Sequence, residues 1–530
     1  MKTILSHNHT SKSAFLVIGL LMLIVWIKTQ VFFHFSILYT DCDQAVLWQT
    51  LHDISKGNFF QPCFYGQAYN SGLESILAWP FYALGMKEYY ALPLVSILIS
   101  LLPYLILALL FIQKKDWWAA IFTLLLYLWL PPFYDLFTAL PRGFVTGLFA
   151  CSFLLPAWFF PENKKVLALA GFTLPFAFWL NYNTVIFIVP FLVKLALAHY
   201  KKPISFFIFY FILTVPGLVW ILFTRNFYLT HPHYLVHSIE ISKFKWKYIY
   251  EFWTNWNNWL GYLTPGLWKF SQLVFIFLLI PLITFIRTKN REMLLIYLSF
   301  IGILVFSTGF EKIKDGVTSD IFFPLSRMFL CFTLMLILFL APIFSAWIKR
   351  FQASWISLLA IVALSSMITI QKHNELALRS KWDFINKLEI RVQQMPIEHV
   401  FYKCNELQQI SNQYKPDLIV FAINETYEFN YLLLPYACPC LVDDLPTTIV
   451  KSYDRRGHLI TKIKRIKFHR ILVLNKQETL EKRVQSDPKH YRKIKSRENS
   501  YFLFESKEGI TWLDFNFSIS NYQERIRFRP

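Results

Sequence analysis

The chain has 530 residues, of which 55% are hydrophobic and only 16% are charged. Soluble domains rarely sustain so large an apolar fraction over this length, because their surfaces need charge to stay dispersed. A formal net charge of +20 would suggest nucleic acid as the partner of a soluble protein, but here lysine and arginine gather in short loops between apolar runs. Loop cations orient membrane helices and meet anionic lipid head groups, so membrane lipids and no nucleic acid are the expected partners.

An apolar run at 14–34 follows a polar, slightly basic N-terminus. A secretory signal would have a shorter apolar core and a small-residue cleavage site, so we expect a retained first membrane helix. Together with later runs it predicts a polytopic α-helical membrane protein with about eleven spanning helices. The later runs fall at 89–112, 117–133, 143–160, 165–180, 184–198, 205–224, 270–286, 293–308, 323–347 and 352–370.

The segment 73–86 is also apolar, but Glu74, Pro80 and Gly85 interrupt it. Such breaks fit an interfacial or half-inserted helix better than a full span. We therefore leave this segment out of the count of spanning helices.

Basic residues mark every second loop between the predicted helices. With the N-terminus in the cytoplasm, the opposite loops near 134–142 and 181–183 hold one arginine between them, and 35–72 holds only Lys56. This asymmetry follows the positive-inside rule and favours a membrane protein whose residues after 371 lie outside the cytoplasm. The cytoplasmic loops would carry Lys114, Lys115, Lys164, Lys165, Lys201, Lys202, Arg287, Lys289, Arg291, Lys349 and Arg350.

The last part of the chain loses the long apolar runs and becomes charged and mixed. The segments 417–423 and 470–474 have the composition of buried strands, and 406–413 that of a short helix. We therefore expect a transmembrane domain at 1–370 and a small extracytoplasmic α/β domain at 371–530.

The seven cysteines fall into three groups. An oxidising exterior would permit one disulfide in the first outer loop and one in the outer domain, whereas thiols inside apolar helices are packing residues. The Cys-Pro-Cys spacing is too tight for an ordinary bridge between its own two members. The groups are Cys42 and Cys63 in the loop, Cys404, Cys438 and Cys440 in the outer domain, and Cys151 and Cys331 in apolar helices.

The first outer loop places Asp41 and Asp43 directly after a membrane helix. Two carboxylates at this spacing can bind a divalent metal ion or deprotonate a hydroxyl group, and their cost near hydrocarbon favours a functional role. The alternative is that they cap the next helix, expected at 44–55, since aspartate is a favoured N-cap. The residues alone leave both interpretations open.

The loop continues with Gln44-Ala45, then Gly-Asn-Phe-Phe at 57–60, Tyr-Gly-Gln-Ala-Tyr at 65–69, small residues and Leu-Glu at 73–74. This order resembles the first outer loop of GT-C-type membrane glycosyltransferases, especially bacterial relatives of the dolichyl-phosphate-mannose protein mannosyltransferases. The likeness covers about forty residues, and the helix layout extends it to about the first 350. Gln44 replaces the family's usual glutamate, and Ser71-Gly72 stands where Gly-Ser is more common.

The resemblance implies an inverting transfer of a sugar from a polyprenyl-phosphate donor to a lipid, glycan or protein acceptor. Asp43 matches the position of the catalytic base, and Asp41 would assist it or bind a metal ion. No cofactor is certain, and a divalent metal ion, held by Asp41 and Asp43, is the one candidate. Substrate contacts would come from Glu74, Tyr65, Gln67 and Tyr69.

A departing lipid phosphate needs positive charge close by. Arg142, in Ala-Leu-Pro-Arg-Gly-Phe, is expected at the outer start of a helix, where the helix N-terminus also favours anions. Arg327, in Phe-Pro-Leu-Ser-Arg-Met, is expected at the start of another and resembles a late Arg-Tyr motif of the family, with Met328 replacing the tyrosine. Alternatively, each arginine binds the phosphate of ordinary phospholipid.

The loop at 225–268 combines histidines, which suggest a zinc site, with tryptophans at helical spacing. Tryptophan and lysine together are typical of an interfacial helix, which is the favoured interpretation. The residues are His231, His233, His237, Trp253, Trp256 and Trp259.

Two other function classes fit the same helix count. A transporter or flippase would carry charges at the bilayer midplane, whereas here the acidic residues near the predicted spans gather toward one face. A non-catalytic membrane anchor would tolerate exchange of Asp43 and Arg327 without loss of function.

Overall fold

The computed structural model divides the chain into two compact units. The helical unit comprises Met1–Ile37, Pro93–Phe223 and Glu240–Val392, and the sheet unit comprises Leu38–Leu92, Thr224–Ile239 and Gln393–Pro530. The structure describes residues 2–201, 203–235, 244–254, 256, 260–266, 273–310, 328–350, 355–379, 395–421, 434–438, 447–450, 463, 465–474, 478–497 and 501–512.

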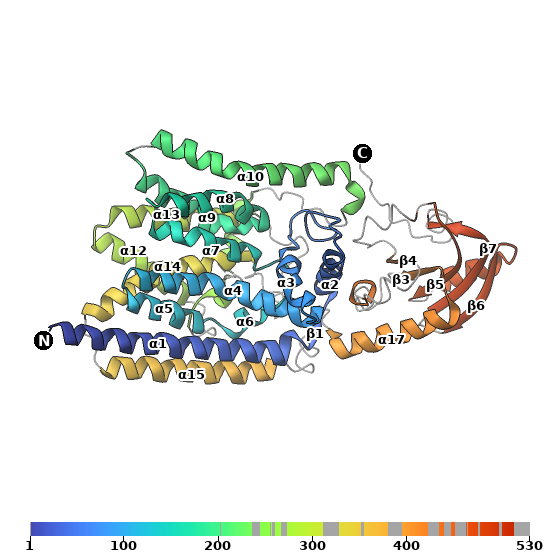
Figure 1. The fold of residues 1–530 in the computed structure, drawn as a ribbon, viewed down its shortest axis with the longest axis horizontal. Helices are drawn as coiled ribbons and strands as arrows, with labels where there is room; N and C mark the ends of the chain where they lie inside the picture. The colour runs from blue at the N-terminus through green and yellow to red at the C-terminus, as the bar shows by residue number, and fades with distance from the viewer. Residues whose placement is uncertain are drawn as a thin grey trace. The chain divides into compact units, whose positions relative to one another are not determined.

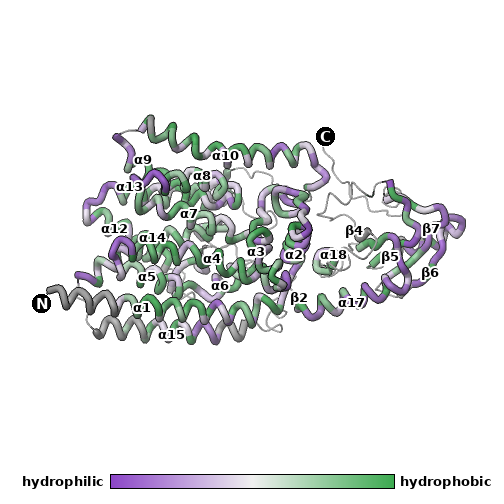
Figure 2. Tube along the Cα trace, viewed as in Figure 1, coloured by the Kyte–Doolittle hydropathy of each residue, from purple (hydrophilic) through white to green (hydrophobic). Residues whose placement is uncertain are grey.

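Long apolar helices build the helical unit (Figure 1). Among the described residues, five helices are long and apolar enough to cross a membrane, and a bent pair is a sixth when counted as one span. Figure 2 shows apolar residues along these helices and polar residues at their ends. The helices are α1 (Lys2–Val31), α4 (Glu88–Gln113), α5 (Trp117–Leu128), α6 (Pro132–Thr138), α7 (Thr146–Phe159), α8 (Lys164–Leu180), α9 (Val185–Ala198), α10 (Pro203–Thr230), α11 (Trp246–Thr254), α12 (Leu273–Arg287), α13 (Arg291–Thr308), α14 (Leu330–Arg350) and α15 (Trp355–Arg379).

The expected polytopic helical architecture is confirmed, and one predicted span needs correction. The run at 117–133 is not one helix: α5 ends at Leu128 and α6 begins at Pro132, bent by 85° from α5. Pro131 and Pro132 explain the break, because proline cannot donate the backbone hydrogen bond that continues a helix. The total of about eleven spans stays a prediction.

The segment after the first loop forms α3 (Leu73–Ala83), which has 11 residues. At 1.5 Å per residue it is too short to span hydrocarbon, as its broken apolar pattern predicts. The interfacial helix expected around the tryptophans is matched only in part, because α11 ends at Thr254 and includes Trp253 but not Trp256. Trp259 lies outside the described residues, and the interfacial position stays a prediction.

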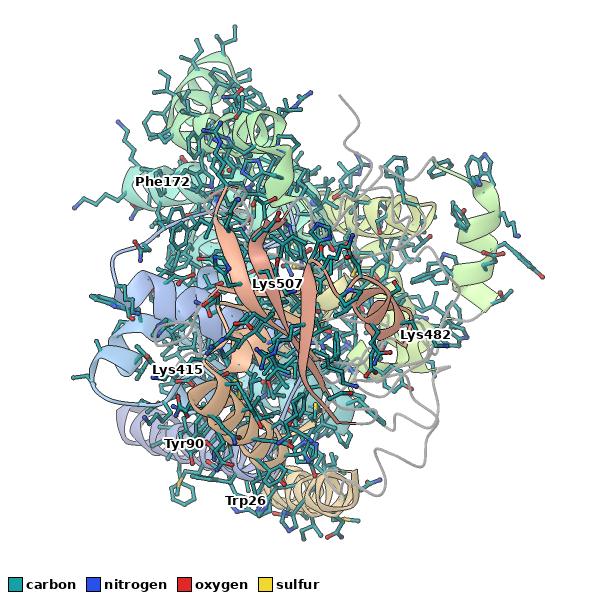
Figure 3. The ribbon with its side chains drawn as sticks, turned by 90° about the vertical axis from the view of Figure 1, so that its right-hand side faces the viewer. Trp26, Tyr90, Phe172, Lys415, Lys482 and Lys507 are labelled. Atoms are coloured by element: carbon teal, nitrogen blue, oxygen red, sulfur yellow. A yellow bond between two sulfur atoms is a disulfide. The ribbon has the colours of Figure 1, made fainter. Side chains whose placement is uncertain are left out.

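The sheet unit contains a five-stranded sheet in the order β4-β3-β5-β7-β6. The first three strands in this order are parallel and the last two are antiparallel to their neighbours. Figure 3 faces this unit, with Lys507 on β7, Lys482 on α21 and Lys415 after α17. The elements are β3 (Leu418–Phe421), β4 (Thr447–Val450), β5 (Lys467–Leu474), β6 (Tyr491–Arg497), β7 (Tyr501–Thr511), α17 (Ile397–Tyr414), α18 (Leu434–Ala437) and α21 (Glu478–Ser486).

The two strands expected from the sequence are present as β3 and β5, and the helix expected at 406–413 is the second half of α17. Buried side chains on β3, β5 and β7, including Val420, Ile471 and Phe504, form the core together with Val484 of α21. Two short strands, β1 (Tyr39–Thr40) and β2 (Met395–Pro396), pair antiparallel and join the start of the first loop to the last third of the chain.

A disulfide between Cys404 on α17 and Cys438 after α18 confirms the bridge allowed for this region. Its Cα atoms are 5.7 Å apart, and it closes a loop of 34 residues. Cys440 lies outside the described residues. The bridge therefore fixes the position of α18 against α17 within the sheet unit.

Removing this disulfide, with Cys404→Ser and Cys438→Ser together, is expected to lower the free energy of unfolding by roughly 3–4 kcal/mol, because a loop of this length gains that much freedom in the unfolded chain. Thermal unfolding of the full chain, with and without a reductant, measures the effect. Reductant should lower the midpoint of the wild type and leave the double variant unchanged. A wild type that is equally stable when fully reduced would contradict the prediction.

Candidate functional site

The first outer loop begins with Asp41, which caps helix α2 (Cys42–Ser55). Its Oδ1 accepts hydrogen bonds from the backbone N–H groups of Asp43 (2.9 Å) and Gln44 (3.0 Å), and its Oδ2 accepts one from Gln44 Nε2 (2.9 Å). These bonds satisfy N–H groups that have no partner inside the helix. For Asp41, the capping interpretation is therefore confirmed, and its side chain is 1% exposed.

Asp43 lies in the first turn of α2 and is half-buried. It does not supply the cap, since Asp41 does. The N-terminal end of a helix carries partial positive charge, which stabilises an ionised carboxylate at this position. Of the two loop aspartates, Asp43 is thus the one whose carboxylate is not used to start the helix.

Tyr65 is buried beneath the loop surface and holds the loop to α2. Its hydroxyl donates to Asp53 Oδ2 at 2.8 Å, and Gln49 Nε2 donates to Asp53 Oδ1 at 2.9 Å. Burial, followed by the charge of Asp53, raises the pKa of Tyr65 well above its ordinary value, so the phenol stays protonated and remains a donor. The structure gives Tyr65 a supporting role.

Tyr65→Phe is expected to destabilise the sheet unit by about 1.5–3 kcal/mol, because a buried carboxylate loses a hydrogen-bond donor. Thermal unfolding of the full chain in detergent measures the change. Tyr200→Phe is the control, since Tyr200 is 67% exposed and should lose nothing measurable. An unchanged midpoint for the Tyr65 variant would show that the bond to Asp53 adds no stability.

Gln67 and Tyr69 belong to a compact turn after the first loop helix. The backbone N–H of Gln67 donates to the Phe64 carbonyl and that of Phe64 to the Asn70 carbonyl, both at 2.9 Å. Gly66 has a φ of +82°, a left-handed conformation that glycine adopts without strain. Gln67 is buried and Tyr69 half-buried, so of the two Tyr69 is the more accessible to a substrate.

Glu74 lies in the first turn of α3 and is fully buried. The next residue, Ser75, donates from its hydroxyl to the Leu47 carbonyl of α2 at 3.0 Å, which ties the two helices together. An acidic side chain at a helix start is favourable electrostatically. The structure thus places Asp43 and Glu74, both predicted site residues, in the first turns of two helices that pack on each other.

Arg142 belongs to the helical unit and is 4% exposed. It lies in the turn between α6 and α7, beside Gly143, whose φ is +76°. Its guanidinium carbon lies 6.0 Å from the centre of the Phe144 ring. Helix α7 begins at Thr146, so Arg142 precedes the helix by four residues and does not lie at its start, where the sequence predicted it. Arg327 lies outside the described residues.

The bridge allowed between Cys42 and Cys63 is not formed, and both residues are buried thiols. The thiol of Cys63 forms a hydrogen bond with Tyr228 instead of a disulfide. Burial raises the pKa of Cys63 to about 12, so the thiol is unreactive at neutral pH. Cys151 and Cys331 are packing residues inside the helical unit, with their sulfurs 3.8 Å apart.

Metal-binding candidates were Asp41, Asp43 and the histidines of the long loop. Across the described ranges, no group of three or more histidine, cysteine, aspartate or glutamate side chains is placed to hold a metal ion. The rings of His231 and His233 lie 5.9 Å apart, and His237 lies outside the described residues.

Sequence reasoning missed a buried ionic cluster in the helical unit. Lys28 and Lys372 both bind the carboxylate of Asp135. The available signal was a lysine near the end of the first apolar run and an aspartate in the same short loop as Arg142. Nothing in the sequence pairs residues so far apart.

The fold is similar to that of a solved membrane protein over nearly its whole length. ArnT from Cupriavidus metallidurans in the apo state matches with a TM-score of 0.54 and 12% identity, covering 92% of this chain and 97% of that chain. The same protein bound to undecaprenyl phosphate matches with a TM-score of 0.52 and 12% identity, covering 92% and 98%. No protein-family profile and no curated protein sequence matches this chain. The chain therefore has the fold of ArnT.

Proposed function

We propose that this protein is an inverting glycosyltransferase that moves a sugar from a polyprenyl-phosphate donor to a lipid, glycan or protein acceptor. The observation that carries the proposal is the similarity of the chain's fold to that of ArnT, a protein whose structure has been solved with undecaprenyl phosphate bound. The first-loop sequence, which resembles the GT-C pattern around Asp43, supports the same function independently of the fold.

The reaction is one displacement at the anomeric carbon. Asp43 accepts the proton of the acceptor hydroxyl as that oxygen forms a bond to the anomeric carbon. The bond between this carbon and the phosphate oxygen breaks, and the leaving polyprenyl phosphate keeps the electron pair. Arg142, together with Arg327, neutralises the charge that develops on the phosphate. Glu74 and Tyr69 orient the sugar or the acceptor.

The proposal includes the placement of the chain in a bacterial inner membrane. The N-terminus is cytoplasmic, the domain at 1–370 holds about eleven spans, and the first loop and the α/β domain at 371–530 lie outside. The charge asymmetry of the short loops supports this orientation. Labelling of single cysteines introduced at Lys56 and Lys489, both exposed, with an impermeant reagent on intact cells tests it.

The test of the function is an assay with purified protein and the host's own lipid extract. Mass spectrometry should show loss of a lipid-linked sugar and formation of an equal amount of polyprenyl phosphate. Repeating the assay with a chelator tests the divalent ion at Asp41 and Asp43. A folded protein that moves the lipid across proteoliposomes without releasing polyprenyl phosphate would be a flippase. A folded protein that neither moves nor consumes the lipid-linked sugar would support the non-catalytic membrane anchor.

A further inference from the structure

An ionic cluster joins three helices inside the helical unit. Asp135 of α6 receives Lys28 Nζ of α1 at 2.8 Å on Oδ1 and Lys372 Nζ of α15 at 2.9 Å on Oδ2. The three side chains are 2–5% exposed. Helices α1 and α15 run side by side, and both contact α6 (Figure 1). The single carboxylate thus connects α1 and α15, the first and last of the described helices in this unit.

The surroundings of the cluster are polar and aromatic. Lys28 Nζ also donates to Thr138 Oγ1 at 3.4 Å and lies 5.5 and 5.8 Å from the ring centres of Tyr127 and Tyr134. The Tyr134 hydroxyl is hydrogen-bonded to Tyr104 at 2.8 Å. Charges buried among apolar helices are costly, and ion pairs of this kind add little net stability. Their presence favours a role in fixing a geometry.

Helix α6 is the element that needs such fixing. It has seven residues, begins with a proline, and is bent by 85° from α5. A helix of two turns is marginal by itself. Lys28 contacts both Asp135 in the first turn of α6 and Thr138 at its end, and Lys372 contacts Asp135 as well, so the two lysines attach α6 to α1 and α15. Four residues after Thr138 the chain reaches Arg142.

We infer that Asp135 is a positioning residue, which fixes α6 through Lys28 and Lys372 and thereby sets the place of Arg142. This inference rests on the proposed function, in which Arg142 binds the phosphate of the lipid donor. A displacement of about 1 Å at a binding group is enough to cost roughly a hundredfold in activity. Asp135 itself does not touch the substrate in this scheme.

Because the cluster holds two lysines and one aspartate, replacing the aspartate and replacing one lysine should differ in effect. Asp135→Asn leaves two buried ammonium groups without a counter-charge, whereas Lys372→Met leaves one matched pair of Lys28 and Asp135. The aspartate variant should therefore be the more harmful of the two. Equal harm from both substitutions would contradict this order.

The experiment measures binding of undecaprenyl phosphate and the KM for the lipid-linked donor in detergent-purified full-length protein. Asp135→Asn is expected to raise the Kd and the donor KM about tenfold or more, with a smaller change in the KM for the acceptor. In an Arg142→Lys background the same substitution should add little, because its effect acts through Arg142. Asp116→Asn is the control: Asp116 pairs with Lys349 at the surface of the same unit, and asparagine still caps α5.

If Asp135→Asn does not fold, the same measurements are made on the triple variant Lys28→Met, Asp135→Asn, Lys372→Met, which removes all three charges. A folded triple or single variant with wild-type affinity for undecaprenyl phosphate would overturn the inference, as would additive effects with Arg142→Lys. A wild type that neither binds undecaprenyl phosphate nor transfers sugar would instead overturn the proposed function. The two failures are therefore distinguishable.

Discussion

Asp43→Asn is expected to reduce sugar transfer by a factor of roughly 10² to 10⁴, the usual contribution of a general base. Asparagine has nearly the same shape as aspartate but cannot take the proton of the acceptor hydroxyl. The fold should be retained, because the cap of α2 is provided by Asp41 and its bonds to the Asp43 and Gln44 backbone N–H groups. The measurement is the rate at which polyprenyl phosphate appears, at matched amounts of folded protein.

Asp41→Asn is the matched comparison, two residues away in the same loop. Asparagine is also a favoured N-cap, so the helix start is preserved and the expected loss is less than tenfold. A large loss for Asp43→Asn beside a small one for Asp41→Asn would assign the base to Asp43. Full activity of a folded Asp43 variant would refute that assignment and leave both aspartates as parts of the helix start.

The first loop was predictable because its residues act on their near neighbours in sequence. A capping aspartate, an amphipathic helix and a glycine turn are local features, so the pattern around Asp41 and Asp43 identified both the start of α2 and the candidate base. The strands β3 and β5 were predictable for a similar reason, since their cores are continuous runs of β-branched and leucine residues.

The strands β6 and β7 were missed because their sequences lack that signal. Strand β6 reads Tyr-Arg-Lys-Ile-Lys-Ser-Arg, with a register shift between Lys493 and Lys495 that disturbs the alternation of sides. It is an edge of the described sheet, where a row of charges is common and discourages pairing with another chain. The charged sequence of β6 therefore gave no indication of a strand.

The ionic cluster shows the second limit of sequence reasoning. Asp135 and Lys372 are 237 residues apart, and no local pattern relates them. Lys28 resembles a residue that reaches toward the membrane surface from the end of a helix. Only the packing of α1, α6 and α15 turns these unremarkable charges into one buried group. The same packing decides where the turn carrying Arg142 lies.

Arg142→Gln is expected to lower kcat/KM for the lipid donor by a factor of about 10² to 10³, comparable with the loss of a group that stabilises a developing anion. Burial of the side chain strengthens its attraction for a phosphate, since little water is present to screen it. Arg142→Lys keeps the charge but loses the planar fork of donors, so its activity should lie between those of the wild type and Arg142→Gln.

Arg350→Gln is the matched control for this series, because Arg350 is exposed in the last turn of α14 and should tolerate the change. The alternative role of Arg142, binding ordinary phospholipid, predicts a different pattern. Such a site would leave kcat/KM for the donor unchanged and alter only the stability of the protein in detergent. A steep loss of activity in a folded Arg142→Gln variant, together with a smaller loss in Arg142→Lys, would place the guanidinium at the departing phosphate.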